Sequence, residues 1–257
     1  MVRGIYTGCM GMLVQMAKLN VVANNIANVN TTGYKKDSTS FKTFNSILIH
    51  RIGSRPYVRL KDRVKAIPIG KMETGVVVDR ITTDFQPGNY VYTQSPLDLA
   101  LQGDGFFTIK GADGVYKYTR NGEFSLNSNG LLVTKNGEEV LSITGQPIRI
   151  NGKFSIDERG YVYVNGKTVD KIMITHFSNN TGLRKIGDNY FIPTTVSGPP
   201  LYDTQTKVMQ YTIEGSNVNV VKQMVKMIES QRAYEINGRV VSTEDQMLDK
   251  AVNNILR

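Results

Sequence analysis

The chain has little of several residue types on which common kinds of site depend. Among its 257 residues there are one cysteine, two histidines and no tryptophan. The single cysteine, Cys9, excludes a disulfide within the chain and a zinc site made of several thiolates. His50 and His176 have no histidine or cysteine at ligand spacing, and no Gly-x-Ser-x-Gly elbow occurs. The sequence therefore predicts no catalytic, cofactor-binding or metal-binding residues, and we expect no enzyme.

Long apolar runs are also absent. No stretch of about 18 apolar residues occurs, so we expect no membrane insertion. The first residues, 1–5, do not form a charged region followed by an apolar one, so no cleavable secretory signal is visible. The protein either stays in the cytoplasm or leaves by a route that uses no such signal.

Acidic residues are fewer than basic ones, and the net charge is +9. The excess is concentrated in segment 51–71, where Asp62 is the one acidic residue. The basic residues there are Arg51, Arg55, Arg59, Lys61, Arg63, Lys65 and Lys71. Such a segment can bind an anionic polymer or an acidic protein surface, or it can be a solvated loop or a charge-protected edge strand. Tyr57 is its one aromatic residue suited to base stacking, so we favour the second interpretation and expect no nucleic acid partner.

The C-terminal segment 218–257 predicts a long helix, because it contains no proline and one glycine, Gly238. One heptad register of the a/d type contains Val220, Met224, Met227, Tyr234, Val241, Leu248, Val252 and Ile255. Three positions of this seam are not apolar: Gln231, Gly238 and Asp245. A second apolar stripe consists of Val221, Val225, Ile228, Ile236, Val240, Met247 and Ala251. A helix with two apolar stripes needs partners on more than one side.

The N-terminal segment 1–30 predicts a matching helix that ends near Asn28–Gly33. Its heptad seam is Ile5, Cys9, Met12, Met16, Leu19, Ala23 and Ile26. We predict that the two terminal helices pair as a coiled coil, with the second stripe facing neighbouring subunits. An ordinary two-helix contact inside one globular domain is the alternative.

Between the helices the pattern changes to short strands. From 72 to 210, apolar runs alternate with turn dipeptides. Six dipeptides suit hairpins with positive φ at both central residues: Asp113-Gly114, Asn121-Gly122, Asn129-Gly130, Asn136-Gly137, Asn151-Gly152 and Asn165-Gly166. The fold class is therefore a mainly β body of antiparallel hairpins with two terminal helices. The predicted domains are a helical core made of 1–33 plus 217–257 and a β body at 72–216. Between them, 34–71 is predicted as an extended basic connector, in which 40–48 could form a short helix. Ser216 or Asn217 is the expected N-cap of the second helix.

Two patterns that suggest a binding site fail on inspection, and a third stays open. Segment 160–168 resembles a phosphate-binding loop, but five residues separate its glycines where four are required. Segment 127–130 hints at a calcium loop with Gly130 at its sixth position, but position 12 of that loop would be Asn136 and not glutamate. Two carboxylates could converge as a glycosidase pair, which depends on geometry and not on composition.

Several segments together resemble the flagellar basal-body rod and hook proteins. Segment 24–36 resembles the N-terminal signature of that family, and segments 101–107 and 118–124 resemble its strand signatures. Segments 214–219 and 227–237 resemble its C-terminal signature, with 231–237 and 243–248 most similar to the distal-rod branch and next to the proximal-rod branch. The residues of this chain that we assign to the family signature are Asn24, Asn25, Asn28, Gly33, Gly105, Phe106, Phe107, Ser216, Asn217, Arg232, Tyr234 and Asn237. The basic segment after the N-terminal signature departs from the polar segment usual in the distal-rod branch.

This resemblance implies a structural subunit that self-assembles helically into a hollow shaft, which transmits motor torque to the hook and filament. It implies a homo-oligomer that contacts other rod and hook proteins, the flagellar export apparatus and surrounding ring proteins. It also implies a place in the basal body, reached through type III export without a cleavable signal. The expected assembly interface is Ile5, Met12, Met16, Leu19, Ile26, Val220, Met224, Met227, Tyr234, Val241, Leu248, Val252 and Ile255. Two other functions stay open on the sequence: a binding module that uses segment 51–71 on an anionic polymer, and a β enzyme acting on cell-wall carbohydrate.

Overall fold

The computed structural model describes residues 2–50 and 68–255, and the chain forms two compact bodies. The helical body contains Met1–Ala23, Ser38–Thr82 and Met224–Arg257. The strand body contains Asn24–Asp37 and Thr83–Gln223. Each body is therefore built from segments that are far apart in the sequence.

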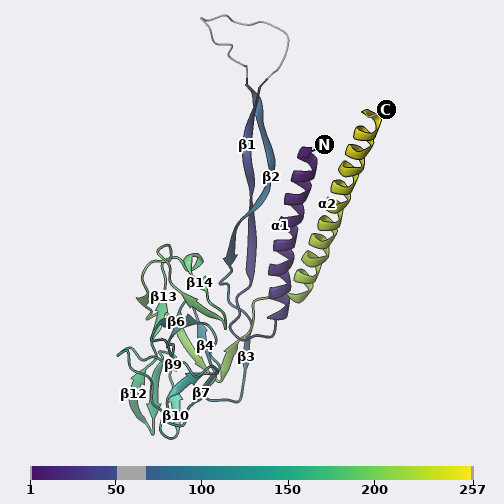
Figure 1. The fold of residues 1–257 in the computed structure, drawn as a ribbon. Helices are drawn as coiled ribbons and strands as arrows, with labels where there is room; N and C mark the ends of the chain where they lie inside the picture. The colour runs from purple at the N-terminus through teal and green to yellow at the C-terminus, as the bar shows by residue number, and fades with distance from the viewer. Residues whose placement is uncertain (1, 51–67, 256–257) are drawn as a thin grey trace, which may run out of the picture. The chain divides into compact units, whose positions relative to one another are not determined.

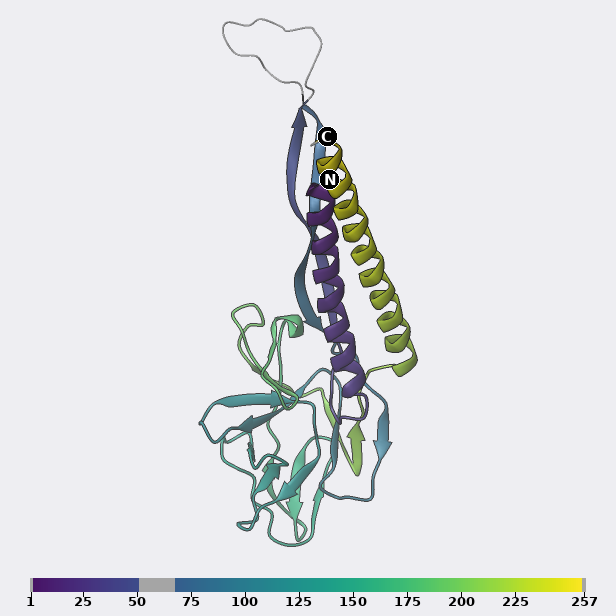
Figure 2. The same cartoon turned by 45° about the vertical axis from the view of Figure 1, so that its right-hand side comes forward.

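The helical body consists of parts of two helices and a two-stranded ribbon. The elements are α1 (Val2–Ala27), α2 (Val220–Ile255), β1 (Asp37–His50) and β2 (Pro68–Thr83). Figures 1 and 2 show the ribbon and the two helices running side by side. Helix α1 contacts the ribbon, since the Thr7 hydroxyl donates to the Thr74 carbonyl at 3.1 Å. Both expected helices are thus present, and α2 is unbroken across Gly238, as the lack of proline predicted.

Segment 34–71 contains a strand where a short helix was considered. The helix at Ser40–Leu48 is wrong, because these residues belong to β1 and pair with β2. The Ser40 hydroxyl donates to the Arg80 carbonyl at 3.2 Å and adds to this pairing. Long-range pairing overrides a weak local pattern here. The basic residues between 51 and 67 lie outside the described residues.

The strand body is built from short antiparallel strands. Its strands are β3 (Tyr90–Tyr92), β4 (Leu99–Gln102), β5 (Phe106–Lys110), β6 (Tyr116–Thr119), β7 (Phe124–Leu126), β8 (Leu132–Thr134), β9 (Glu139–Val140), β10 (Phe154–Ile156), β11 (Tyr161–Val164), β12 (Lys167–Lys171), β13 (Ile174–His176), β14 (Arg184–Lys185), β15 (Tyr190–Ile192), β16 (Leu201–Tyr202), β17 (Lys207–Gln210) and β18 (Thr212–Glu214), with a 3-10 helix at Asn180–Gly182. The main sheet has the order β14-β15-β6-β5-β9-β8-β7, with β13 pairing β5 and β16. The remaining sheets are β10-β11-β12, β17-β4 and β18-β3. The prediction of a mainly antiparallel β protein with two helices is confirmed.

Strand β5 separates two apolar cores. Successive side chains of a strand point to opposite faces, so Phe106 and Phe107 enter different clusters. Phe107 packs edge-on against Phe124 with ring centroids 5.1 Å apart, and Phe106 packs edge-on against Phe177 at 5.8 Å. Both phenylalanines are fully buried. This explains why the strand signature at 106–107 holds two adjacent large apolar residues.

The glycine turns differ in detail from the prediction. Positive φ at both central residues occurs at Asn165-Gly166, with φ of 50° and 79°. At Gly114, Gly130 and Gly137 the glycine of the dipeptide has positive φ and the residue before it does not. The amide of each glycine donates a hydrogen bond to the carbonyl of the residue three positions earlier. Gly122 is not a turn glycine: a Cβ there would lie 1.6 Å from the Leu99 carbonyl oxygen, so the residue permits a close backbone approach.

The expected N-cap of α2 is also wrong. The helix begins at Val220, and the Asn219 side chain accepts a hydrogen bond from the Lys222 amide at 2.9 Å. Asn217 instead binds the strand body, as described below. Ser216, Asn217 and Asn219 could each cap the helix, and tertiary bonding selects among them.

The buried phenol of Tyr190 generates a prediction about alkaline stability. Burial raises the pKa of Tyr190 to about 12, and its hydroxyl donates to the Thr134 hydroxyl at 3.1 Å. The pKa of this phenol is higher in the folded state than in the unfolded state, where it is near 10, so the folded protein holds the proton more tightly. The free energy of unfolding should therefore fall by about 2 kcal/mol as the pH rises from 10 to 12. We expect Tyr190→Phe to flatten the fall of unfolding free energy between pH 10 and 12 in urea titrations. An equally steep fall in both proteins would contradict this assignment.

Candidate functional site

The N-terminal signature forms a hydrogen-bonded turn after α1. The Tyr34 hydroxyl donates to the side-chain oxygens of Asn24 and Asn25 at 2.9 and 3.0 Å. Asn25 in turn donates to the Asp37 carbonyl and accepts from the Asp37 amide. Asn28 donates to the Asn24 carbonyl at 2.9 Å. These asparagines are therefore structural, because each satisfies backbone or hydroxyl groups of the turn.

Gly33 lets this turn lie directly on the strand body. Its φ is +68°, and a Cβ there would lie 2.5 Å from the Asn121 amide nitrogen. Its own amide donates to the Glu214 carbonyl at 2.7 Å. A side chain at this position would meet both a strained φ and rigid backbone.

Three buried charged groups meet behind the turn, and we call them the junction cluster: Lys35, Arg120 and Glu214. All three side chains are 0–1% exposed. Lys35 Nζ lies 2.6 Å from Glu214 Oε1, which also accepts the Gly88 amide at 3.0 Å. Lys35 Nζ donates further to the Gln86 carbonyl at 2.9 Å. One carboxylate thus compensates charges that burial alone would make very costly.

Arg120 is the cluster's link to the body. Its Nη1 lies 3.5 Å from Glu214 Oε2, and its Nη2 donates to the Gly103 carbonyl at 2.7 Å. Its guanidinium carbon sits 5.0 Å from the centre of the Phe106 ring, in cation–π contact. Burial lowers the pKa of Lys35 and of Arg120, and the Glu214 carboxylate opposes both shifts.

Asn217 joins the C-terminal signature to the same place. Its side-chain oxygen accepts from the Lys36 amide at 2.8 Å, and its amide group donates to the Asp84 and Gln86 carbonyls at 2.8 and 3.0 Å. Its backbone amide donates to the Tyr34 carbonyl at 3.4 Å. The hydroxyl oxygen of the neighbouring Ser216 accepts a hydrogen bond from the Val218 amide.

A second ion pair holds the other side of the turn. Lys185 Nζ lies 2.9 Å from Asp37 Oδ2, donates to the Lys35 carbonyl at 2.5 Å and sits 4.3 Å from the Tyr34 ring centre. Burial lowers the pKa of Lys185, and Asp37 opposes the shift. Of this network, the sequence pointed to Asn24, Asn25, Asn28, Gly33, Ser216 and Asn217. Lys35, Arg120 and Glu214 lie within the signature segments 24–36, 118–124 and 214–219 but were not singled out, and Lys185 lies outside these segments. A charged residue carries no mark of burial in the sequence.

In the helical body, α1 contacts α2 through glycines. A Cβ on Gly8 would lie 2.7 Å from Val241 Cγ2, and one on Gly11 would lie 2.9 Å from Asn237 Nδ2. Gly4 approaches α2 in the same way. Spacings of four and three place these glycines on one helix face. Sequence reasoning passed over them because it searched for large apolar residues.

The predicted interface residues divide between half-buried and exposed positions. Half-buried are Ile5, Met12, Leu19, Ile26, Met227, Val241 and Leu248, and exposed are Met16, Val220, Met224, Tyr234 and Val252, with Ile255 ending α2. Met12 also contacts α2, since its sulfur lies 3.6 Å from the Cβ position of Gly238. The signature residue Arg232 is exposed, and Asn237 faces Gly11.

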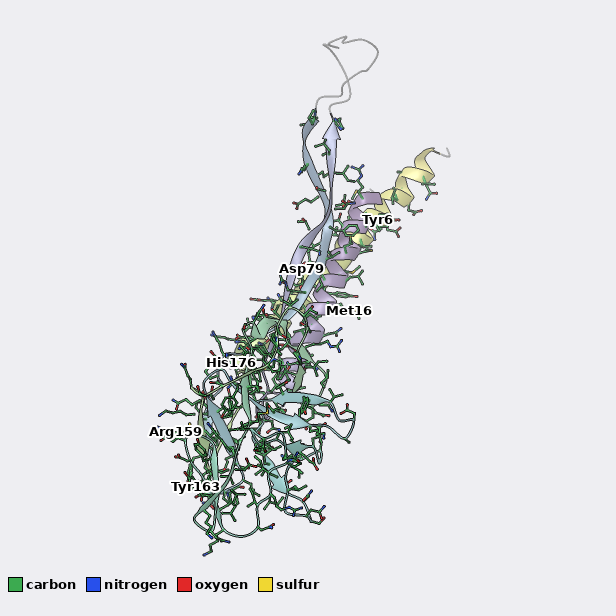
Figure 3. All side chains as sticks on the ribbon, turned by 90° about the vertical axis from the view of Figure 1, so that its left-hand side faces the viewer. Tyr6, Met16, Asp79, Arg159, Tyr163 and His176 are labelled. Carbon is green, nitrogen blue, oxygen red and sulfur yellow. The ribbon has the colours of Figure 1, made fainter. Side chains whose placement is uncertain are left out.

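Both helices also carry uncovered apolar side chains. We call the second stripe of α2 the outer stripe: Val221, Val225, Ile228, Ile236, Val240, Met247 and Ala251. Ala251 is half-buried, and the other six are between 44% and 71% exposed. On α1, Tyr6 and Met16, labelled in Figure 3, are 67% and 53% exposed. Contiguous apolar patches on a protein surface are typical of interaction sites.

Comparison with known proteins places these features in a family. Residues 5–35 match the family described as flagella basal body rod protein, residues 100–171 the flagellar hook protein FlgE/F/G D1 domain, and residues 209–255 the flagellar basal body rod FlgEFG protein C-terminal region. The chain is 35% identical to the flagellar basal-body rod protein FlgG of Buchnera aphidicola, over 97% of this chain and 98% of the relative. It is 35% identical to the FlgG of Borreliella burgdorferi over the whole of both chains, and 36% identical to that of Caulobacter vibrioides over 96% of this chain and 97% of the relative. The chain belongs to the flagellar basal-body rod protein family.

The three matched segments of this rod protein meet at the junction cluster. Lys35 lies in the first, Arg120 in the second and Glu214 in the third. The family is one of structural proteins and not of enzymes. Neither alternative function, the anionic-polymer module or the carbohydrate enzyme, receives support from the comparisons.

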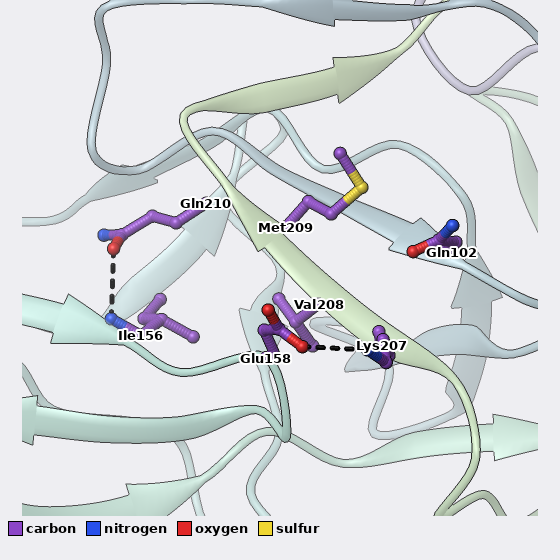
Figure 4. Close-up of a pocket in the computed structure, with 7 residues that line it drawn as sticks. All are labelled: Gln102, Ile156, Glu158, Lys207, Val208, Met209 and Gln210. Carbon is purple, nitrogen blue, oxygen red and sulfur yellow. Dashed lines mark hydrogen bonds and ion pairs between the residues drawn. The ribbon is translucent and has the colours of Figure 1, made fainter.

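The hollow of the strand body drawn in Figure 4 offers no pair of carboxylates. The hollow in Figure 4, about 400 Å³, is lined by Glu158 and Lys207 in an ion pair of 3.0 Å, with Gln210 accepting the Ile156 amide. Glu158 is the one carboxylate among its lining residues. Within the described ranges no cluster of three or more candidate ligands could hold a metal ion, and no helix could span a membrane.

The glycine face generates a prediction about helix pairing. We expect Gly8→Leu to force α1 and α2 apart, with an overpacking cost of about 1–3 kcal/mol that exceeds the gain in helix propensity of about 1 kcal/mol. Amides of both helices should then exchange faster with solvent and melting should occur at lower temperature. Asn20→Leu, which adds the same side chain at an exposed position of α1, is the control. Equal behaviour of the two variants would show that Gly8 is not a contact residue.

Proposed function

We propose that this chain is a structural subunit of the bacterial flagellar rod and that it self-assembles helically into a hollow shaft that carries torque to the hook and filament. The outer stripe of α2 is the observation that carries this proposal. It is a long apolar face on a chain whose relatives are named basal-body rod proteins. The relatives named FlgG favour the distal part of the rod.

In the assembled rod, the terminal segments 1–33 and 217–257 form the axial core and pair as a coiled coil along the seam that contains Met227 and Leu248. Segment 72–216 forms the outer body, and segment 34–71 connects the two. Contacts of Gly8 with Val241 and of Met12 with the Gly238 position support helix pairing. Other copies cover the outer stripe, and its burial at about 25 cal/mol per Å² drives polymerisation.

Partners of the subunit are copies of itself, other rod and hook proteins, the export apparatus and the rings that surround the rod. It reaches the basal body through the flagellar export route. Its composition suits this route, because a single cysteine cannot form an intramolecular disulfide that would resist unfolding.

The function is tested by complementation. We expect the chain, produced in a bacterium that has lost its own distal rod protein, to restore hook–basal bodies that contain it and to restore swimming. A chain that is produced and exported, yet is absent from isolated basal bodies, would contradict the proposed role.

The two apolar faces of α2 predict different variant behaviour. Ile228→Asp with Ile236→Asp changes exposed side chains, so the monomer should keep its helix content while rod assembly falls at least about tenfold. Met227→Asp with Leu248→Asp changes half-buried seam residues, so it should block assembly and also increase amide exchange in both helices. The strand body should remain folded in both variants.

Light scattering, electron microscopy and amide exchange measure these outcomes. Lys222→Asp, at an exposed polar position of α2, is the control for added negative charge. Normal assembly of the Ile228 and Ile236 double variant would show that the outer stripe stays uncovered in the rod, and the proposed interface would be wrong.

A further inference from the structure

Three distant segments of the strand body are bonded to one another at the junction cluster. We name them the turn (33–37), the linker (84–89) and the C-terminal segment (214–217). Turn and C-terminal segment share the Lys35–Glu214 ion pair at 2.6 Å and the bond from the Gly33 amide to the Glu214 carbonyl at 2.7 Å. They also share the bond from the Lys36 amide to the Asn217 side chain at 2.8 Å.

The linker is held by both of the other segments. Its Gln86 carbonyl accepts from Lys35 Nζ and from the Asn217 side chain, so one acceptor serves the turn and the C-terminal segment. The Asp84 amide donates to the Lys36 carbonyl at 2.9 Å, and the Gly88 amide donates to Glu214 Oε1 at 3.0 Å. Each segment therefore completes hydrogen bonds of the other two.

The charges of the junction cluster make the docking of each segment depend on the others. The body contributes Arg120, the turn contributes Lys35, and the C-terminal segment contributes Glu214, the carboxylate that contacts both cations. The charges of Asp104 and Asp203 also raise the pKa of Arg120, and therefore favour its charged form. If the C-terminal segment leaves, two buried cations lose their shared counter-charge. If the turn leaves, Glu214 Oε1 loses Lys35 and keeps the Gly88 amide, while Oε2 faces Arg120 at 3.5 Å with no hydrogen bond.

We propose that the junction cluster is a latch, through which the turn, the linker and the C-terminal segment dock on the strand body together or not at all. The chain entering α2 and the chain leaving α1 are then fastened by a single cooperative event, although Lys35 and Glu214 are 179 residues apart. This device does not depend on the proposed function, because it concerns contacts within one subunit.

The experiment changes the turn and measures the C-terminal segment. In Lys35→Met, the cation is replaced by an apolar chain of similar length. Breaking a buried ion pair corresponds to about a 100-fold or larger change in an opening equilibrium. We therefore expect the amides of Gly33, Asp84, Gly88 and Asn217 to exchange about 100-fold faster in the full-length monomer, all by a similar factor, measured by NMR.

Lys36→Met is the matched control. Lys36 is adjacent in sequence, and its ion pair with Asp84 at 3.2 Å has both side chains about 30% exposed. We expect exchange at the reporter amides to change less than about threefold in this variant, because exposed pairs contribute little. Amides of β5 and β6 should keep their protection in both variants.

A second variant, Glu214→Gln, removes the shared carboxylate and keeps the side-chain shape. It should open the same amides at least as much as Lys35→Met. The latch is wrong if Lys35→Met speeds exchange in the turn while Asn217 and Gly88 stay protected. It is also wrong if β5 and β6 open to the same extent, because the three segments would then not be a unit distinct from the body.

Discussion

A single buried carboxylate, shared between two buried cations, joins three segments of the strand body that lie far apart in the sequence. Glu214 contacts Lys35 and Arg120 at positions that are 0–1% exposed. Breaking a buried pair costs about 3–5 kcal/mol, which is a large fraction of the stability of many domains. Arg120 also stacks on Phe106, so the charged cluster is continuous with one of the two apolar cores. Electrostatic and apolar contributions to the fold therefore meet at one arginine.

The helical body shows the opposite arrangement, with apolar surface left in solvent. Glycines on α1 allow close contact with α2 on one face, while the outer stripe of α2 stays uncovered. A stable monomer normally buries such a stripe, whereas a subunit of a polymer needs it for its neighbours. The same chain thus combines a strand body whose apolar side chains pack into two buried cores with helices that leave apolar side chains exposed. This combination fits a structural protein of the basal body.

Particular residues show how far the sequence could be interpreted. The lack of proline predicted α2 as one helix, and the apolar runs predicted most strands. The ribbon of β1 and β2 was not predicted, because pairing between residues such as Ser40 and Arg80 has no local signal. The N-cap was expected at Ser216 or Asn217, two or three residues too early, since Asn217 binds the linker and Asn219 caps the helix. The glycine face escaped a search that used side-chain hydrophobicity alone.

The sequence by itself determined the family, the two terminal helices, the antiparallel strands and the two apolar stripes of α2. These follow from periodicity and from residue order, which are local properties of the chain. Only the tertiary structure decided that Lys35, Arg120 and Glu214 share one buried site, and that Gly4, Gly8 and Gly11 of α1 lie close against α2. Burial and close approach depend on residues far away in the sequence, and a charged side chain or a glycine looks the same at a solvated surface as at a packed contact.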